Sequence, residues 1–202
     1  MNKYMKIILI IALIACACAK NPFSTRRSDP PLGAGGTWDT PQTPEVAIRN
    51  LLFSYNEKVI SNYELCLSDS FLFSSPEDSI DAINNGRGDL FIDWGKSVDI
   101  ASATIIFRNF SISDTLSLFL SLTPSQDHRD DTGDSLAIIY RNYSLLIIKV
   151  SAGIADTARA SGLATFHMIQ EQLNWWTIRW WEDIPLPAGH FDWGDFKAEY
   201  RR

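Results

Sequence analysis

The stretch "NWWTIRWWEDI", residues 174–184, decides the fold class. Its β-branched and aromatic side chains are typical of a β-strand. Successive residues of a strand point to opposite faces of the sheet, so the stretch has two different faces. The residues expected to lie in the core are Trp176, Ile178 and Trp180. The opposite face is expected to point outward, where Trp175 and Trp181 are available for contact with a ligand or partner.

Four stretches nearer the N-terminus have the same character. They are rich in β-branched and aromatic residues and are bounded by turn residues: 103–113, 115–122, 136–150 and 162–169. In the second of them, leucines alternate with mostly small side chains, so one face is apolar. We therefore expect five strands that pair into an antiparallel sheet.

The region before these strands carries helix signals. "TPE", residues 43–45, places threonine at an N-cap, proline at the first helical position and an acid in the first turn. One helical face follows with the spacing i, i+3, i+4, i+7 and i+11: Ile48, Leu51, Leu52, Tyr55 and Val59. A second short helix is expected at residues 62–67. Helices followed by an antiparallel sheet predict a single α+β domain over residues 43–202.

The N-terminus has the pattern of an export signal. Lys3 and Lys6 precede the aliphatic residues 7–15, a run too short to span a bilayer but long enough for a signal peptide. The junction "LIAC", residues 13–16, resembles the lipobox of bacterial lipoproteins. This resemblance implies cleavage just before Cys16, lipid attachment to its sulfur, and a membrane anchor in the bacterial cell envelope.

Other interpretations of these cysteines remain open. Ala17 and Ala19 form an A-x-A cleavage site, and cleavage there would release a secreted chain without Cys16 or Cys18. A metal or redox role for the two cysteines would require further ligands, and Cys66 is the only other cysteine of the chain. The lipid anchor is the interpretation that accounts for both the aliphatic run and the position of the cysteine.

The segment between the lipobox and the predicted domain differs from both in composition. Residues 17–42 are rich in Pro, Gly, Ser and Thr, which predicts a flexible tether, although Trp38 offers one ring that packs on a folded surface. The expected organisation is a signal peptide over 1–15, a lipidated cysteine and tether over 16–42, and the domain over 43–202.

The charge of the chain argues against nucleic-acid binding. Its formal net charge is −6, and loss of the two lysines of the signal peptide changes this to −8. Proteins that bind nucleic acids neutralise phosphates with clustered lysines and arginines. We therefore expect no nucleic-acid partner.

Three segments together resemble a known superfamily. They are the amphipathic helix, the short helix that ends in "YELCLSDSFLF" at residues 63–73, and the terminal strand. Together they look like the cone-shaped nuclear transport factor two-like (cystatin-like α+β) superfamily, and in particular like uncharacterised bacterial lipoproteins of that fold. The residues that fit the lipoprotein pattern are Trp176, Ile178, Trp180, Glu182, Asp183, Trp193, Gly194 and Lys197. The resemblance implies helices packed on a strongly curved antiparallel sheet, but no particular activity, because this fold hosts isomerases, dehydratases, carriers and scaffolds.

Candidate chemistry is sparse. His167 is expected on the face opposite Phe166 and Met168, where it could act as a general base or serve as a structural or surface residue. Glu182 is expected to cap the end of the sheet with its neighbour Asp183 and to pair with Arg179. No spacing matches an acid–base set, so we assign no catalytic residue. The possible ligand or partner contacts are Trp175, Trp181, His167 and Glu182.

The acidic segment "DHRDDTGD", residues 127–134, invites comparison with a calcium loop. Arg129 stands where the second acidic ligand of an EF-hand loop belongs, and no glutamate closes the segment. We interpret it as a solvated hairpin tip, and we expect neither a metal site nor a cofactor.

Three functions fit these observations. The first is an envelope lipoprotein whose domain binds a small apolar ligand or an envelope protein without catalysis. The second is an isomerase or hydrolase with its site inside the cone, which the missing acid–base set disfavours. The third is a structural envelope component that forms homodimers through its sheet.

Overall fold

The computed structural model describes residues 35–111, 115–171 and 174–201, which belong to one compact unit. The predictions for the signal peptide, for Cys16 and for the tether up to residue 34 lie outside these residues. The helices are α2 (Pro44–Glu57), α3 (Ile60–Cys66), α4 (Pro76–Asn84), α5 (Lys96–Ser111) and α6 (Trp193–Ala198). The strands are β1 (Leu67–Ser74), β2 (Leu116–Pro124), β3 (Asp131–Thr132), β4 (Leu136–Ser151), β5 (Ile154–Gln170) and β6 (Trp176–Pro185).

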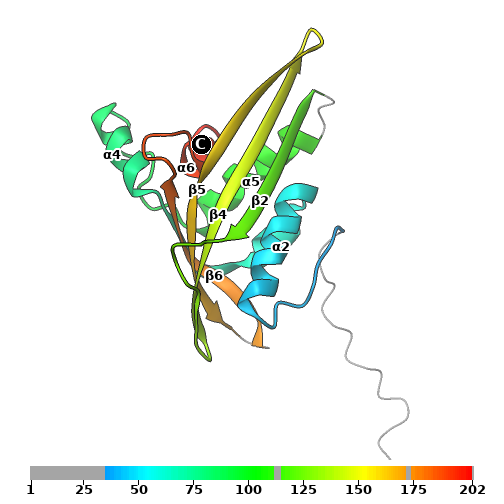
Figure 1. Cartoon of the computed structure of the whole chain (residues 1–202), viewed down its shortest axis with the longest axis vertical. Helices are drawn as coiled ribbons and strands as arrows, with labels where there is room; N and C mark the ends of the chain where they lie inside the picture. Colours follow the sequence, from blue (N-terminus) through cyan, green and yellow to red (C-terminus); the bar gives the residue numbers. More distant parts are fainter. Residues whose placement is uncertain (1–34, 112–114, 172–173, 202) are drawn as a thin grey trace, which may run out of the picture. The chain divides into compact units, whose positions relative to one another are not determined.

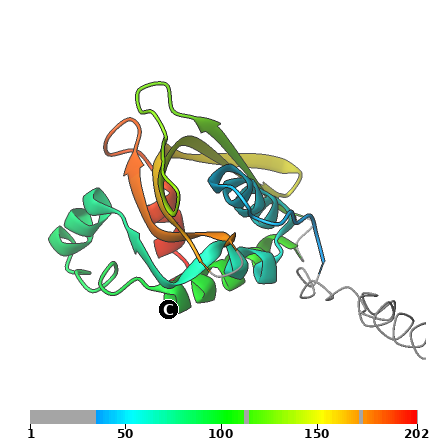
Figure 2. The same ribbon diagram turned by 90° about the horizontal axis from the view of Figure 1, so that it is seen from below.

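The strands form one six-stranded sheet in the order β1-β6-β5-β4-β2, and β3 pairs with β4. All neighbours are antiparallel except β1 and β6, which are parallel. The long β4–β5 hairpin runs along the molecule (Figure 1), and the sheet curls around the helices on its concave side (Figure 2). The predicted α+β class, with helices packed on a strongly curved sheet, is confirmed. The prediction of a purely antiparallel sheet is wrong at its edge, because the unpredicted strand β1 pairs in parallel with β6.

The first helix begins where the sequence predicts it. The Thr43 hydroxyl accepts a hydrogen bond from the Val46 amide at 3.3 Å, and Pro44 occupies the first turn. Lys58 ends the helix in a left-handed conformation, with φ of 58°. The predicted apolar face is buried at Ile48, Leu51 and Tyr55, which pack in the core.

One predicted strand is wrong. Residues 103–113 were expected to be extended, but the described part of that stretch, up to Ser111, belongs to helix α5. The buried residues of α5 have the spacing of one helical face: Asp99, Ser102, Ala103, Ile106, Phe107 and Phe110. The β-branched composition is only a weak preference, and burial of this face against the sheet outweighs it.

The predicted faces of the terminal strand hold for only half of its length. Trp176 and Ile178 are buried as expected, but Trp180 is 37% exposed and Trp181 is fully buried. The register explains the reversal, because His167 pairs with Trp180 while the adjacent Met168 pairs with Ile178. The unpaired residue is Arg179, which forms a β-bulge. One extra residue shifts a period-2 pattern to the opposite face.

The interior of the cone is filled by side chains. Helix α6 contributes Trp193, Phe196 and Lys197, each at most 2% exposed. The Trp193 ring packs edge-on against Tyr55 of α2 and Trp181 of β6, with centroid distances of 5.0 and 4.3 Å. The Trp193 indole also donates to the Tyr55 hydroxyl at 2.9 Å. These side chains belong to the hydrophobic core on the concave side of the sheet.

The folded region begins earlier than predicted. Residues 35–42 were assigned to the tether, but Asn50 of α2 accepts from the Asp39 amide at 3.0 Å and donates to the Asp39 carbonyl at 2.6 Å. The Trp176 amide donates to the Pro41 carbonyl at 2.8 Å, and Trp38 packs against the core. These contacts fix residues 38–41 to the domain.

Among the described residues, no helix combines the length and the apolar character that a transmembrane helix requires.

Candidate functional site

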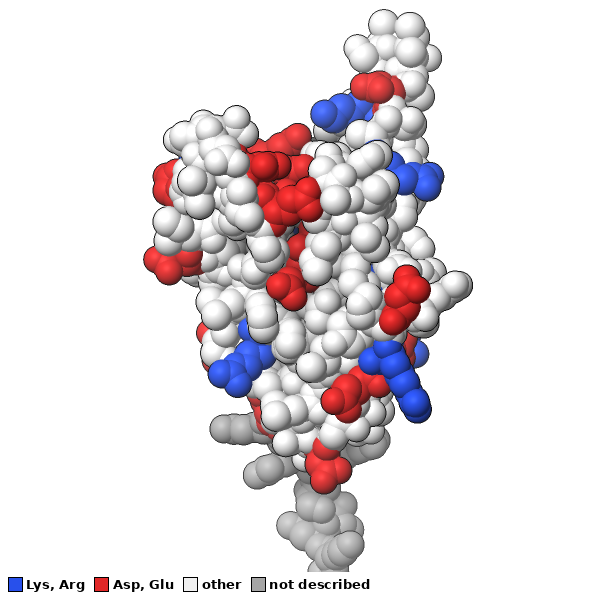
Figure 3. Space-filling view, turned by 60° about the vertical axis from the view of Figure 1, so that its left-hand side comes forward, with Lys and Arg blue, Asp and Glu red and all other residues white. Residues whose placement is uncertain are grey.

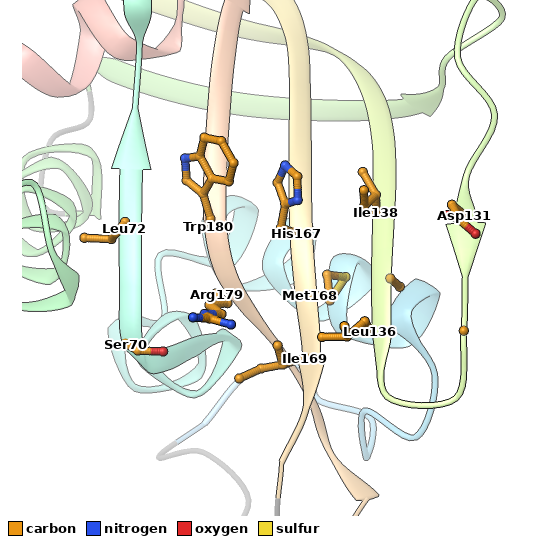
Figure 4. A pocket seen from close by; sticks show the side chains of 12 residues that line it. Ser70, Leu72, Asp131, Leu136, Ile138, His167, Met168, Ile169, Arg179 and Trp180 are labelled. Atoms are coloured by element: carbon orange, nitrogen blue, oxygen red, sulfur yellow. The ribbon is translucent and has the colours of Figure 1, made fainter.

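A row of side chains crosses the outer face of the sheet. Leu72 of β1 is in register with Trp180 of β6, Trp180 with His167 of β5, and His167 with Ile138 of β4. Asp131 of β3 continues the row, because it is in register with Ile138. Figure 4 shows these five side chains side by side, each from a different strand. The bulge at Arg179 brings Trp180 into this row.

The row forms part of an open groove of about 820 Å³. Its lining residues come from β1, β3, β4, β5 and β6 and the β3–β4 turn: Ser70, Leu72, Asp131, Gly133, Leu136, Ala137, Ile138, His167, Met168, Ile169, Arg179 and Trp180. Leu72 is 55% exposed and Leu136 is 62% exposed. Mostly apolar concave surface with a few polar groups is typical of ligand sites, and this volume lies in their usual range.

His167 and Trp180 form the flattest part of the groove. Their rings are stacked with a centroid distance of 4.4 Å and an interplanar angle of 17°. Partial burial lowers the pKa of His167, and the charge of Glu182 acts in the opposite direction. The imidazole is therefore mainly neutral near pH 7, which suits contact with an apolar or aromatic group.

Arg179 supplies the positive charge of the groove. The β-bulge leaves this residue unpaired in the β5–β6 ladder, and its side chain is exposed. It lies in Figure 4 beside Ser70 and below Trp180. The sequence-based pairing of Arg179 with Glu182 is wrong, since no ion pair of Arg179 occurs among residues 35–111, 115–171 and 174–201. An exposed guanidinium beside apolar surface can bind an anionic group.

The structure separates the four predicted contact residues. His167 lines the groove, and Glu182 is half-buried nearby, where its charge acts on His167. Trp175 lines a different cleft of about 650 Å³, together with Lys96. Trp181 is fully buried and contacts neither cleft, so its assignment to the outward face is wrong. Of the lining residues, only His167 was among the predicted contacts, and those missed include Leu72, Leu136, Ile138, Arg179 and Trp180.

The acidic segment before β4 is tied down by hydrogen bonds. Both oxygens of Asp130 accept from the Arg141 guanidinium, at 2.9 and 2.8 Å, and one of them also accepts from the Tyr140 amide at 2.9 Å. Glu45 of α2 pairs with the same guanidinium. Arg141 is 3% exposed, so these carboxylates neutralise a buried charge. The segment thus holds β3 at the edge of the groove.

Comparison with known proteins identifies the fold and no closer relationship. No protein-family model matches the chain, and no curated protein is similar to it in sequence. The β subunit of benzoate 1,2-dioxygenase from Burkholderia mallei is similar in structure, with 9% identity, a TM-score of 0.54, and coverage of 75% of this chain and 93% of that chain. A conserved protein from Planctomyces limnophilus gives 12% identity, a TM-score of 0.52, and coverage of 70% and 93%.

A protein of the nuclear transport factor 2-like superfamily is also among the similar structures. A nuclear transport factor 2 (NTF2-like) superfamily protein from Salmonella enterica gives 14% identity, a TM-score of 0.45, and coverage of 74% of this chain and 91% of that chain. Of these similar structures, the two with TM-scores above 0.5 are a dioxygenase subunit and a conserved protein. The shared fold therefore does not select an activity, and the function has to be argued from the residues of this chain.

Proposed function

We propose that this protein is a lipid-anchored protein of the bacterial cell envelope that binds an amphipathic small molecule with an anionic group, without converting it. The observation that carries the proposal is the groove on the outer face of the sheet, where exposed apolar side chains lie near the Arg179 guanidinium, which forms no ion pair with another described residue. Both parts of such a molecule find a matching surface there. The sequence predicts a small apolar ligand, and the exposed Arg179 adds an anionic group to that description.

The apolar part of the ligand would lie along the cross-strand row. The stacked rings of His167 and Trp180 form a flat surface, and Leu72 and Leu136 extend it to both sides. Burying apolar surface contributes about 25 cal/mol per Å². The anionic group would reach Arg179, whose planar guanidinium binds carboxylates and sulfonates through paired N–H donors.

The side chains of the groove support binding without turnover. A general base is itself the proton acceptor, and in enzymes a further group usually orients it. In the described part of the chain, the His167 ring stacks on Trp180 and forms no hydrogen bond with another side chain. The cone interior, where an isomerase or hydrolase of this architecture would act, is packed with Trp193, Phe196 and Lys197.

The location rests on the sequence. The lipobox-like residues 13–16 support lipid attachment at Cys16, and several acyl chains together hold a protein firmly on a membrane. Residues 17–34 would then separate the domain from the bilayer.

The proposal is tested by titrating the compact unit, residues 33–202, with anilinonaphthalene sulfonate, an amphipathic anion whose fluorescence rises in apolar surroundings. We expect saturable binding that weakens about tenfold or more in Trp180→Ala and in Arg179→Gln. Phe119→Ala is the matched control, because Phe119 is 55% exposed on β2 outside the groove. Equal affinity of all three variants and the wild type would place the probe elsewhere and reject the groove.

Homodimerisation through the same face is the second candidate function. Leu72, Leu136 and Trp180 are exposed by 55%, 62% and 37%. Exposed apolar surface of this kind often marks an interface between proteins. Light scattering separates the two candidates: a dimer that dissociates in Leu136→Asp favours the interface, and a monomer that binds the probe favours the ligand site.

A further inference from the structure

The first part of strand β5 leaves one of its two edges unpaired. Strand β5 pairs with β4 from Ile154 to Ile169, but with β6 only from Gly162 onward. In the described part of the chain, residues 154–160 therefore have a strand on one side only, and they are exposed as far as Arg159. The tip of the β4–β5 hairpin projects beyond the helices at the top of Figure 1, and it stands free of the body in the space-filling view of Figure 3. This edge is open to another chain.

The register of the sheet shows which backbone groups face the open edge. The Ser161 amide donates to the Phe191 carbonyl at 3.3 Å, and the Ser161 carbonyl accepts from the Leu186 amide at 3.2 Å. Both backbone groups of Ser161 thus point away from β4, and the strand repeats every two residues. The preceding residues with the same orientation are Ala155, Thr157 and Arg159. Among residues 35–111, 115–171 and 174–201, no other strand or loop bonds to their backbone groups across this edge.

The other edge of these strands is closed by side chains. Strand β2 ends the sheet on that side. The Asn56 carboxamide donates to the Leu120 carbonyl at 3.0 Å and accepts from the Leu120 amide at 2.8 Å. The Lys58 ammonium donates to the Leu118 carbonyl at 2.5 Å. Sheets protect their edges in such ways because unpaired edges pair with other chains. The β5 edge receives no such protection from the described residues.

We propose that two copies of this chain pair through the open edges of β5, antiparallel and related by a twofold axis at Thr157. In this register Thr157 lies opposite its own copy, and Ala155 of each chain lies opposite Arg159 of the other. Each of these pairs exchanges two backbone hydrogen bonds, so about six bonds form and all the free groups of the edge are used. A contact of the same surface with itself closes as a dimer.

The side chains suit this register. Arg159 faces Ala155 on one side of the joined sheets, and Asp156 faces Ala158 on the other. Each charged side chain therefore lies opposite a small neutral one, and no like charges are directly opposed. The two Thr157 side chains meet at the axis, and cross-strand threonine pairs are favourable.

The adjacent registers fit less well. Moving the axis by one residue toward the hairpin tip would place Asp156 directly opposite its own copy, which is a repulsive pair. Moving the axis by one residue in the other direction would pair Ala155 with Ser161, whose backbone groups are already bonded. The sequence and the loop beside Ser161 thus favour the axis at Thr157.

The contact is small, so the dimer should be weak. Only residues 154–160 of each copy meet, which is less than a standard stable interface requires. We expect a Kd on the order of 10⁻⁵–10⁻⁴ M, so that dilute protein is monomeric. Copies anchored to one membrane would meet at a higher effective concentration. The edge does not line the groove, so this dimer is independent of the proposed ligand and of the dimer through the outer face.

Cysteine cross-linking of the full-length protein in detergent tests the register. In a Cys18→Ser parent, Thr157→Cys should give a disulfide-linked dimer under mild oxidation, because paired Cα atoms lie about 5.5 Å apart. Ala155→Cys is the matched control on the same edge and face, because two copies of this residue lie about 14 Å apart in this register. The parent gives the baseline, since Cys66 is buried. Cross-linking of Ala155→Cys equal to or stronger than that of Thr157→Cys, or none above the parent in Thr157→Cys, would overturn the proposal.

Sedimentation equilibrium of the full-length protein compares two substitutions at one position. Thr157→Pro removes an amide that points to the open edge and not to β4, so the fold should persist while Kd of the dimer rises about tenfold or more. Thr157→Ala keeps this amide and should change Kd by less than about threefold. Leu136→Asp in the groove should dimerise like the wild type. A wild type still monomeric at about 10⁻³ M, equal Kd values of the two Thr157 variants, or dissociation by Leu136→Asp would contradict the edge-to-edge dimer. If Thr157→Pro fails to fold, the cross-linking result decides.

Discussion

Lys197 Nζ lies 2.7 Å from Asp99 Oδ1, and both side chains are almost completely buried. The Tyr63 hydroxyl donates to the other oxygen of Asp99 at 2.5 Å, and the Trp94 indole donates to the first at 3.0 Å. The ammonium also lies 4.0 Å from the centre of the Phe73 ring. This arrangement ties α6 to α5 through a buried charge pair that is compensated by hydrogen bonds and an aromatic ring.

Removing one member of this pair should therefore destabilise the domain strongly. Lys197→Met leaves Asp99 buried without its counter-charge, and loss of one partner of a buried pair costs about 3–5 kcal/mol. The free energy of unfolding from denaturant titration measures this loss. In the double variant Lys197→Met/Asp99→Asn the loss should be smaller than the sum of the two single losses, since no unpaired charge remains. Additive losses would show that the two side chains do not interact.

The terminal strand provides a test of the β-bulge. Trp181→Ala should lower the free energy of unfolding by about 3–5 kcal/mol, because a fully buried ring leaves a cavity. Trp180→Ala should cost less than about 1.5 kcal/mol, because its ring is partly in solvent. Denaturant titrations of the two variants compare adjacent tryptophans on one strand. The reverse order of the two losses would mean that the strand alternates regularly, without the bulge.

The spacing of apolar residues in the sequence predicts a helix or strand well where that spacing is regular along the whole element. The α2 face at Ile48, Leu51 and Tyr55 and the leucines of β2 are such cases. The bulge at Arg179 leaves no comparable signal, because an inserted residue changes only the register with β5. The helix α5 carries its helical spacing in a composition typical of strands. Site residues such as Leu72 and Trp180 come from strands far apart in sequence, so only the sheet register shows that they meet.

Stability should fall as pH rises, because buried carboxyls bind protons more tightly in the folded protein than in the unfolded chain. The pKa values of Asp183, Asp195 and Asp192 are raised from the usual 3.8 to about 7, 6 and 9 in the folded protein, mainly by burial. The folded state therefore binds more protons than the unfolded chain between about pH 4 and pH 9. Their contribution is fully present below the unfolded pKa and is lost as pH rises through the folded values. Thermal unfolding across this range should show Tm falling, with a shallower fall in Asp192→Asn. A Tm that rises from pH 6 to pH 9 in the wild type and remains unchanged by the substitution would refute this assignment.

Lipid attachment has its own test. Cys16→Ser should move the protein from the membrane fraction to the soluble fraction of bacterial cells, because the thioether cannot form. Cys18→Ser is the matched control and should stay with the membrane. Fractionation followed by immunoblotting measures both. Membrane retention of Cys16→Ser equal to that of the wild type would reject the anchor.

Binding of the ligand in the groove can be tested with the indole N–H signals of the tryptophans in nuclear magnetic resonance spectra. Each signal is assigned by its loss in a single Trp→Phe variant of residues 33–202, and the wild type is titrated with anilinonaphthalene sulfonate. We expect the Trp180 signal to shift saturably, because Trp180 lines the groove, while the signals of the core residues Trp181 and Trp193 stay in place. Saturable shifts of Trp181 and Trp193 with an unchanged Trp180 signal would place the ligand inside the cone and reject the groove.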